Sequence, residues 1–205
     1  MKLDKLKSFF QRELVEAGVD EAGRGCLAGP VFAAAVILPA DFFDPLLKDS
    51  KKMSRRQREN MRETIKKEAI DWAVGMASPR EIDDINISNA SFLAMHRALE
   101  QLGQPYGLVL VDGNRYKPGS AHPYQCIVKG DNKFASIAAA AVLAKTARDD
   151  FMTRIAKDWP EYGWQQNAGY PTVRHREAIR LLGATPWHRR SFSLLPKPRH
   201  QKLAG

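Results

Sequence analysis

Residues 15–38 read VEAGVDEAGRGCLAGPVFAAAVIL. The run Val31 to Leu38 is apolar at successive positions, which is typical of a strand covered on both faces. The segment Val15 to Asp20 precedes this run, and a glycine-rich turn from Ala22 to Gly29 separates the two. We therefore expect two strands joined by a glycine turn, with an aspartate where the first strand ends.

Helices and strands are predicted on both sides of this pair. Upstream, apolar residues at helical spacing predict an N-terminal helix over residues 2–14, packed on the body of the protein; an interfacial membrane helix is the alternative. Downstream, we expect helices over residues 54–68, with Ser54 as N-cap, and over 88–102, 131–159 and 172–182. The further expected strands are 72–77, 108–111 and 125–128. Strands that come first and alternate with helices later predict a mixed α/β sheet.

Positive charge is concentrated in two segments of this 205-residue chain, whose formal net charge is +9. Residues 48–67 hold nine Lys or Arg against three acidic residues, and residues 174–202 hold eight against Glu177 alone. Solvated helix faces explain most charge runs. Two such zones on one basic chain also favour contact with a polyanion, either a nucleic acid or an anionic membrane surface.

Several classes of protein are excluded by the sequence. The longest nearly apolar stretch, Leu27 to Ala40, has 14 residues and contains two prolines, so it is too short to span a bilayer. The N-terminal MKLDKLKSFF lacks the apolar core of a secretory signal. Cys26 and Cys126 are too few for a disulfide framework and belong to no Cys/His cluster. We expect a cytoplasmic protein that is not a membrane protein, a secreted mini-protein or a zinc finger.

Carboxylates at the ends of predicted strands are candidates for chemistry. Asp20, Asp112 and Asp131 each follow a short apolar segment and lie near glycine, and Glu21 adds a fourth carboxylate. Metal-assisted phosphoryl transfer needs several carboxylates that converge on one point. Each alone has an ordinary explanation, since Asp112 before Gly113-Asn114 is a good turn former and Asp131 at a helix start is a good N-cap. The four together are candidate ligands of a metal site.

Asp149 serves as a control for this choice. It shares a helix face with Asp131 but lies about 27 Å further along the axis, so the two cannot bind one pair of metal ions. We expect Asp149 to pair with Arg148 or Arg154.

Other polar residues carry weaker indications. Gly23-Arg24-Gly25 has N–H groups that could cradle a phosphate, although the sequence lacks the GK[ST] of a Walker loop. Cys26 is expected to be a small buried thiol, because no histidine lies near it in the sequence. His175 and His188 are expected to be structural or surface residues rather than proton shuttles.

Seven motifs occur along the chain in a fixed order. They are VDEAGRGCLAGPV (19–31), DSKKMS (49–54), IDDINI (82–87), VDGN (111–114), KGDNKFASIAAAAVLAK (129–145), NAGYPTVRH (167–175) and HRRSF (188–192). Together they resemble type 2 ribonuclease H, the bacterial ribonuclease HII, over about residues 15 to 195. A single DEAGRG motif would be suggestive, whereas this ordered set is specific to the family.

The resemblance implies a ribonuclease H-like α/β fold, with a mixed five-stranded sheet flanked by helices and a small helical C-terminal extension. Residues 1–158 are then expected to form the catalytic core with its N-terminal helix. Residues 159–195 are expected to form the extension, which contributes to the substrate groove, and residues 196–205 a flexible basic tail.

The same resemblance assigns functional residues. The catalytic residues and metal ligands are Asp20, Glu21, Asp112 and Asp131. Gly23-Arg24-Gly25 matches the loop whose backbone contacts the ribose 2′-hydroxyl, and Tyr170 matches the tyrosine that stacks on the sugar at an RNA–DNA junction. Lys51 of the DSK motif is an expected phosphate contact. The chain departs from the common family pattern at three positions that are not expected ligands: Cys26, Ala141 and Ala168.

The implied activity is endonucleolytic hydrolysis of the RNA strand of RNA–DNA hybrids, with incision on the 5′ side of ribonucleotides embedded in duplex DNA. Two Mg²⁺ or Mn²⁺ ions are expected to support in-line attack by water, which leaves 3′-hydroxyl and 5′-phosphate ends. We expect a monomer with no small-molecule cofactor and no membrane partner.

Two other interpretations stand beside this one. A nucleic-acid-binding module without catalysis explains the charge but gives no reason for carboxylates at several strand ends. Another metal nuclease of the same fold, such as a type 3 ribonuclease H or a DNA-resolving enzyme, would share the carboxylates. A type 3 enzyme is expected to carry a sizeable additional N-terminal domain, whereas only about 14 residues precede the first expected strand.

Overall fold

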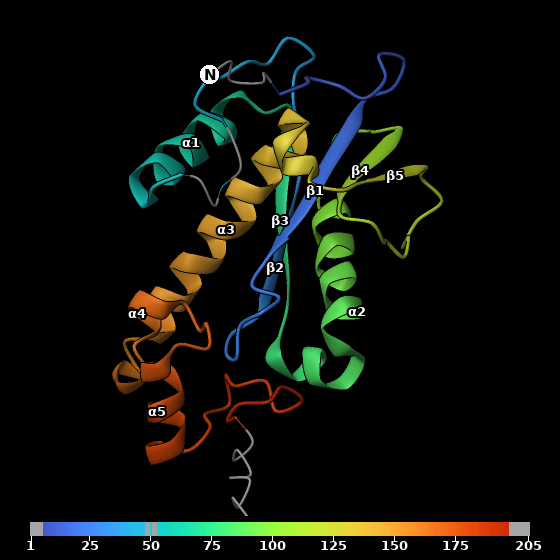
Figure 1. Cartoon of the computed structure of the whole chain (residues 1–205). Helices are drawn as coiled ribbons and strands as arrows, with labels where there is room; N and C mark the ends of the chain where they lie inside the picture. The colour runs from blue at the N-terminus through green and yellow to red at the C-terminus, as the bar shows by residue number, and fades with distance from the viewer. Residues whose placement is uncertain (1–5, 48–49, 51–52, 197–205) are drawn as a thin grey trace, which may run out of the picture.

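A five-stranded mixed sheet forms the centre of the protein (Figure 1). The computed structural model describes residues 6–47, 50 and 53–196. In spatial order the strands are β3 (Asp71–Ala77), β2 (Val31–Ile37), β1 (Glu16–Ala22), β4 (Leu108–Asp112) and β5 (Tyr124–Ile127). β2 pairs antiparallel with both β1 and β3, whereas β1, β4 and β5 run parallel to one another. The predicted fold class is confirmed.

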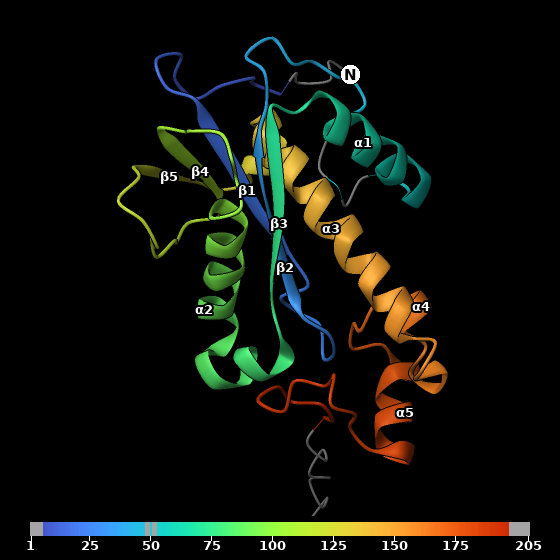
Figure 2. The same cartoon turned by 180° about the vertical axis from the view of Figure 1, so that it is seen from behind.

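Helices cover both faces of the sheet (Figures 1 and 2). On one face, α2 (Pro79–Leu99) packs against β2 and β3; on the other, α3 (Ala135–Ile155) packs against β1 and β2, with α1 (Arg55–Glu68) beside it. Alternate residues of β2 pack into two hydrophobic clusters, one on each face of the sheet. Ala33 lies in the cluster under α2, and Ala34 lies in the cluster under α3. The continuous apolar run of β2 therefore reflects burial on both faces.

The helical C-terminal extension follows α3. It contains a 3₁₀ turn (Pro160–Tyr162), α4 (Trp164–Asn167) and α5 (Val173–Leu182). In Figure 1 it lies at the same end of the sheet as the glycine turn between β1 and β2. The hydroxyl of Thr172 accepts a hydrogen bond from the N–H of His175, so this residue caps α5. Of the helices that the structure describes, none combines the length and apolar character that a membrane span requires.

The predicted N-terminal helix is wrong for the described residues 6–14, which form no helix. Backbone N–H and C=O groups of this segment form hydrogen bonds to other parts of the chain instead. Lys7 forms a parallel bridge with Phe134, with hydrogen bonds of 2.8 and 2.9 Å to the neighbouring backbone. The N–H groups of Phe10 and Gln11 donate to the carboxylate of Glu16. These tertiary bonds replace the intrahelical bonds that the apolar spacing predicts.

Two helix starts also differ from the predictions. α2 begins at Pro79, not near Ser88, because Ser78 caps it; within α2, Asn86 has a φ of 66°, which kinks the helix. α3 begins at Ala135, and the preceding 3₁₀ turn (Gly130–Asn132) carries Asp131. Asp131 is therefore not the N-cap of the long helix, and its side chain lies before α3.

Candidate active site

Asp20 and Asp112 lie at the same end of two adjacent parallel strands. Val19 of β1 is in register with Val111 of β4, so the following aspartates are neighbours. Both side chains face α3, because side-chain direction alternates along a strand and both valines belong to the cluster under α2. Asp20 is only 7% exposed.

Glu21 approaches from the opposite face. β1 ends one residue later, so Glu21 stands on the rim of the sheet. Its Oε1 lies 3.1 Å from the Arg24 guanidinium. Together with Asp112, Arg24 and Ser88 it lines an open groove of about 930 Å³. Near the end of β1, Asp20 and Glu21 therefore point to opposite faces of the sheet, as the alternation of side chains along a strand requires.

The four predicted carboxylates share one electrostatic neighbourhood. Burial raises the pKa of Asp20 well above its ordinary value, and the negative charges of Glu21, Asp112 and Asp131 raise it further. The hydrogen bond of 2.6 Å from the N–H of Glu21 acts in the opposite direction. Close like charges of this kind are stabilised by a cation.

The candidate ligands suit a hard divalent cation such as Mg²⁺, because all of them are carboxylate oxygens. In the described part of the chain, however, no three His, Cys, Asp or Glu side chains converge closely enough to form a ready metal site. Protein donors hold several of these oxygens instead: Gly130 N–H donates to Asp112 at 2.7 Å, and the side-chain amide of Asn132 donates to Asp131 at 2.9 Å. The structure thus brings the four carboxylates to one end of the sheet without assembling them into a ligand cage.

The two glycines of the Gly23-Arg24-Gly25 loop differ in backbone conformation and in the space around them. Gly23 has a φ of 98°, and a Cβ there would collide with the side chain of Arg148. Gly25 has no left-handed φ, is exposed, and has no atom within 4 Å of the position that a Cβ would take. The protein itself therefore requires a glycine at position 23 but leaves open space at position 25.

Tyr170 stands beside this loop. It follows α4, and its side chain is 43% exposed. The N–H of Leu27 donates to the carbonyl of Gly169 at 2.8 Å, which joins the tyrosine segment to the glycine turn. Burial of the inner part of the ring raises the pKa of the Tyr170 phenol, and the hydroxyl contacts the thiol of Cys26.

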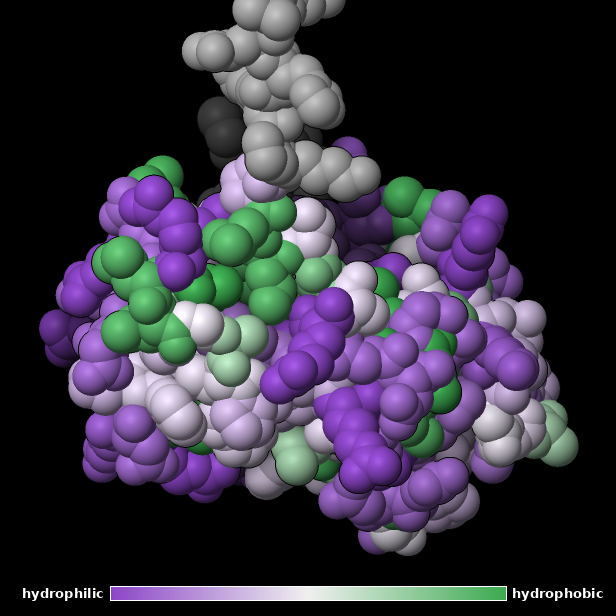
Figure 3. Space-filling model, turned by 90° about the horizontal axis from the view of Figure 1, so that it is seen from below, coloured by the Kyte–Doolittle hydropathy of each residue, from purple (hydrophilic) through white to green (hydrophobic). Residues whose placement is uncertain are grey.

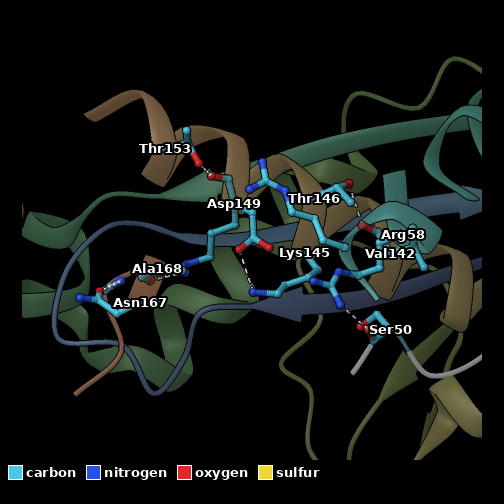
Figure 4. Close-up of polar contacts among 12 residues, drawn as sticks. Ser50, Arg58, Val142, Lys145, Thr146, Asp149, Thr153, Asn167 and Ala168 are labelled. Carbon is cyan, nitrogen blue, oxygen red and sulfur yellow. Dashed lines mark hydrogen bonds and ion pairs between the residues drawn. The ribbon is translucent and has the colours of Figure 1, made fainter. Parts of the chain in front are cut away.

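A smaller pocket of about 290 Å³ adjoins Tyr170 between α1, α3 and α4. Lys145 of α3 lines it, with its Nζ 2.7 Å from Asp149 (Figure 4) and 5.8 Å from the centre of the Tyr170 ring. Arg58 enters from α1 and donates to the carbonyl of Ser50 at 3.1 Å. The predicted pairing of Asp149 with Arg148 or Arg154 is wrong, because Lys145 takes that place.

The remaining predictions have mixed outcomes. Cys26 is a buried thiol, as expected. His175 and His188 are also buried, with their Nε2 atoms 3.1 Å apart, which confirms a structural place for them. Lys51 lies outside the described residues, as does most of the predicted basic tail.

The burial of Arg148 and Arg189, which are 1% and 0% exposed, was not predicted from the sequence. Arg148 donates to the carbonyls of Ala28, Pro30 and Ala168 at 2.8 to 3.1 Å. Arg189 donates to other carbonyls of the same turn. The position of Arg189 within the HRRSF motif indicates a role beyond surface charge, although its charge also places it in the basic segment 174–202.

Comparison with known proteins identifies the family. The family model for Ribonuclease HII matches residues 17–195. The chain belongs to the ribonuclease HII family. Ribonuclease HII of Phocaeicola vulgatus is 56% identical over 93% of this chain and 94% of the relative. That of Parabacteroides distasonis is 57% identical over 94% of this chain and 96% of the relative.

Solved structures agree with this ribonuclease HII assignment. The ribonuclease H2 of Pyrococcus horikoshii OT3 superposes with a TM-score of 0.75 at 25% identity, covering 87% of this chain and 94% of the other. The RNase HII of Archaeoglobus fulgidus, solved in a complex with PCNA, gives 0.72 at 26% identity, covering 90% and 98%. Bst-RNase HIII, solved with Mn²⁺, gives 0.69 at 18% identity, covering 94% and 69%, and shows the fold alone.

This membership makes the protein an enzyme, a hydrolase of the ribonuclease H type. The interpretation as a binding module without catalysis is thereby excluded. Among the related nucleases, the matching model and relatives are ribonucleases HII, which agrees with the type 2 prediction.

Proposed function

We propose that this ribonuclease HII, besides cleaving the RNA strand of RNA–DNA hybrids, nicks duplex DNA on the 5′ side of a single embedded ribonucleotide. The observation that carries the proposal is the exposed loop at Gly25, which follows the carboxylates of Asp20 and Glu21 within a few residues. A ribose seated on this loop has its phosphodiester within reach of the carboxylates. Recognition of the sugar and cleavage of its bond are then coupled by one short segment.

Discrimination depends on one hydroxyl, because the 2′-OH is what distinguishes a ribonucleotide from its DNA neighbours at the level of the backbone. Open space around Gly25 lets backbone N–H groups approach the sugar closely. The exposed ring of Tyr170, fixed beside the loop, offers a flat surface on which a sugar at the RNA–DNA junction can stack.

The carboxylates of Asp20, Glu21, Asp112 and Asp131 are proposed as the ligands of divalent ions. When bound, Mg²⁺ or Mn²⁺ supplies an activated water and stabilises the leaving 3′-oxygen. Asp20 and Asp112 hold their place through the register of β1 and β4, and Asp131 through the bond between Gly130 and Asp112. In-line attack then yields a 3′-hydroxyl and a 5′-phosphate.

Basic side chains supply affinity for the nucleic-acid backbone. Arg55 and Arg58 of α1 and Lys145 of α3 line the pocket beside Tyr170. We assign them, with Lys51, to phosphates of the strand that continues past the junction. The end of the molecule seen in Figure 3 is largely hydrophilic, with a group of hydrophobic side chains at the upper left and others between hydrophilic ones on the right. Such backbone contacts predict affinity that falls with rising salt.

The monomeric state, the cytoplasmic location, the absence of a small-molecule cofactor and the division at residues 158 and 195 stay predictions. Sedimentation of the free protein and of its complex with a duplex tests the first. A mass corresponding to two chains in either sample would contradict it.

The test of the proposed function is cleavage of a labelled DNA duplex that carries one ribonucleotide, with Mg²⁺, with Mn²⁺ and with EDTA. We expect a metal-dependent nick on the 5′ side of the ribonucleotide. Cleavage of a long RNA–DNA hybrid but not of this duplex would overturn the proposal while leaving the family activity intact.

A further inference from the structure

Arg189 is a fully buried cation whose partners are carbonyl oxygens. Its Nη2 donates to Gly23 O at 2.7 Å and to Gly29 O at 2.9 Å, its Nη1 to Arg24 O at 2.9 Å, and its Nε to Gly29 O at 3.0 Å. No carboxylate of the described residues lies within ion-pair distance of it. Burial of a charge without a carboxylate partner is costly, so the hydrogen bonds to these carbonyls must offset the cost.

The bonds fix the direction of the neighbouring N–H groups. In a trans peptide the C=O and the following N–H point in opposite directions. When the carbonyls of Gly23 and Arg24 turn inward to Arg189, the N–H groups of Arg24 and Gly25 turn outward. The outward side at Gly25 is the open space described above. Arg189 thus sets which polar groups of the loop face a ligand.

Arg189 is itself held in place. Its own N–H donates to Leu27 O at 2.9 Å, and its guanidinium stacks on the ring of Phe192 at 5.2 Å. Asp83 of α2 accepts hydrogen bonds of 2.9 Å from the N–H groups of both Arg190 and Ser191. Asp83 of the IDDINI motif therefore anchors the segment that carries Arg189 of the HRRSF motif. The two motifs meet beneath the glycine loop.

Arg148 provides an internal comparison. It is equally buried and also binds three carbonyls, those of Ala28, Pro30 and Ala168. None of these belongs to Gly23-Arg24-Gly25. Arg148 thus attaches the extension to the core, whereas Arg189 binds two carbonyls of the loop itself, those of Gly23 and Arg24.

We propose that Arg189, anchored through Asp83, is the positioning residue for recognition of the ribose: it presents the N–H groups of Arg24 and Gly25 to the 2′-oxygen. This inference rests on the proposed function, because it assumes that the loop contacts the ribose. It assigns the 2′-oxygen the role of hydrogen-bond acceptor. Arg189 touches neither the substrate nor the reacting phosphate.

The experiment compares Arg189→Lys with wild type on two duplexes. KM and kcat are measured on a duplex with one ribonucleotide, and Ki is measured for the all-DNA duplex as a competitor; the ratio Ki/KM reports discrimination. We expect KM to rise about tenfold, equivalent to about 1.4 kcal/mol, while Ki stays unchanged. Lysine keeps the positive charge but lacks the fork that binds three carbonyls.

Two control variants separate positioning from stability and charge. Arg190→Lys makes the same substitution at the exposed neighbouring position. Val36→Ala removes buried apolar volume at the far end of β2 and lowers stability without touching the loop. Both are expected to keep the wild-type ratio. A purely structural role of Arg189 would lower the active fraction, and thus kcat, and leave Ki/KM unchanged, which would overturn the inference.

Asp83→Asn is a milder variant for the case in which Arg189→Lys does not fold. It weakens the anchor from the side exposed to solvent, and we expect Ki/KM to fall about threefold, with fold and melting temperature close to wild type. An unchanged ratio in this folded variant would overturn the inference. Failure of wild type itself to discriminate between the two duplexes would overturn the proposed function instead, so the two failures are distinguishable.

Discussion

The Oδ1 atom of Asp112 accepts a hydrogen bond of 2.7 Å from the backbone N–H of Gly130. This bond links the end of β4 to the 3₁₀ turn that carries Asp131, although 18 residues separate the two positions in sequence. One proposed ligand thereby helps to position another. The same carboxylate lines the groove that contains Glu21.

Asp112→Asn is expected to abolish turnover while preserving the fold. The amide oxygen of asparagine can still accept from Gly130, but the charge that binds a cation is lost. We expect turnover to fall by about 10²–10³ or more, with binding of the duplex unchanged or tighter, since one repulsion with phosphate is removed. Gel-shift and cleavage assays measure both. Asp150→Asn, which changes an exposed carboxylate on α3, serves as control and should cleave normally.

Gly25→Ala and Gly23→Ala are expected to fail for different reasons. A methyl group at position 25 meets no protein atom, so the stability to unfolding should be unchanged or about 0.4–1 kcal/mol higher. It occupies the space assigned to the ribose, and cleavage at an embedded ribonucleotide should be lost. A methyl group at position 23 collides with Arg148 and should lower the melting temperature. Wild-type turnover by Gly25→Ala would contradict the assigned ribose contact.

Tyr170→Ala should impair cleavage at RNA–DNA junctions about tenfold or more, which corresponds to the loss of one aromatic stacking contact of ~1–3 kcal/mol. Tyr170→Phe keeps the ring and removes only the hydroxyl that meets Cys26, so it should retain most of the activity. Both variants are assayed on a junction duplex. Full activity of the alanine variant there would refute the stacking role.

The buried pair His175 and His188 predicts a loss of stability in mild acid. Trp164 Nε1 donates to His175 Nε2 at 2.9 Å, and Thr185 N–H donates to His188 Nδ1 at 2.9 Å, so both rings are bound as neutral acceptors. Burial, with a smaller effect of the neighbouring His175, lowers the pKa of His188 to about 4. The pKa of His175 is also lowered, chiefly by burial.

The sign of the pH effect follows from proton uptake. As pH falls from 6.5 towards 4, the unfolded chain binds a proton at each histidine that the folded protein does not, so the free energy of unfolding decreases. The stabilisation is complete above pH 6.5, and for His188 the part lost by pH 5 is on the order of 2 kcal/mol. Urea unfolding at pH 7.5 and 5 measures it. His188→Gln should reduce this pH dependence, and an equal slope in the variant would disprove the assignment.

Those parts of the fold that depend on local pattern could be predicted from sequence. The doubly apolar run Val31 to Leu38 indicates a strand covered on both faces, and the structure places it between α2 and α3. Ser54 caps α1 as its spacing from Gln57 allows. The positions of Asp20 and Asp112 at strand ends were also evident, since a polar residue directly after an apolar run marks the rim of a sheet.

Features set by distant contacts could not be predicted. The apolar spacing of residues 6–14 is helical, yet pairing of Lys7 with the turn before α3 overrides it. The burial of Arg189 depends on carbonyl groups about 160 residues earlier in the chain. An arginine is expected on the surface unless partners for its guanidinium are known. Here the partners are carbonyls of the glycine turn, which only the folded chain brings beside Arg189.

The two buried arginines cross between the sheet and its extension in opposite directions. Arg148 starts on α3 and reaches the carbonyl of Ala168, whereas Arg189 starts beyond α5 and reaches the turn after β1. Trimming the protein after α3 would deprive the Arg148 guanidinium of one acceptor and three carbonyls of the glycine turn, those of Gly23, Arg24 and Gly29, of their donor. A shortened nuclease that retains every proposed metal ligand would therefore lose the shape of the loop to which the ribose contact is assigned. The described residues after α3 thus form part of the proposed site rather than an accessory to it.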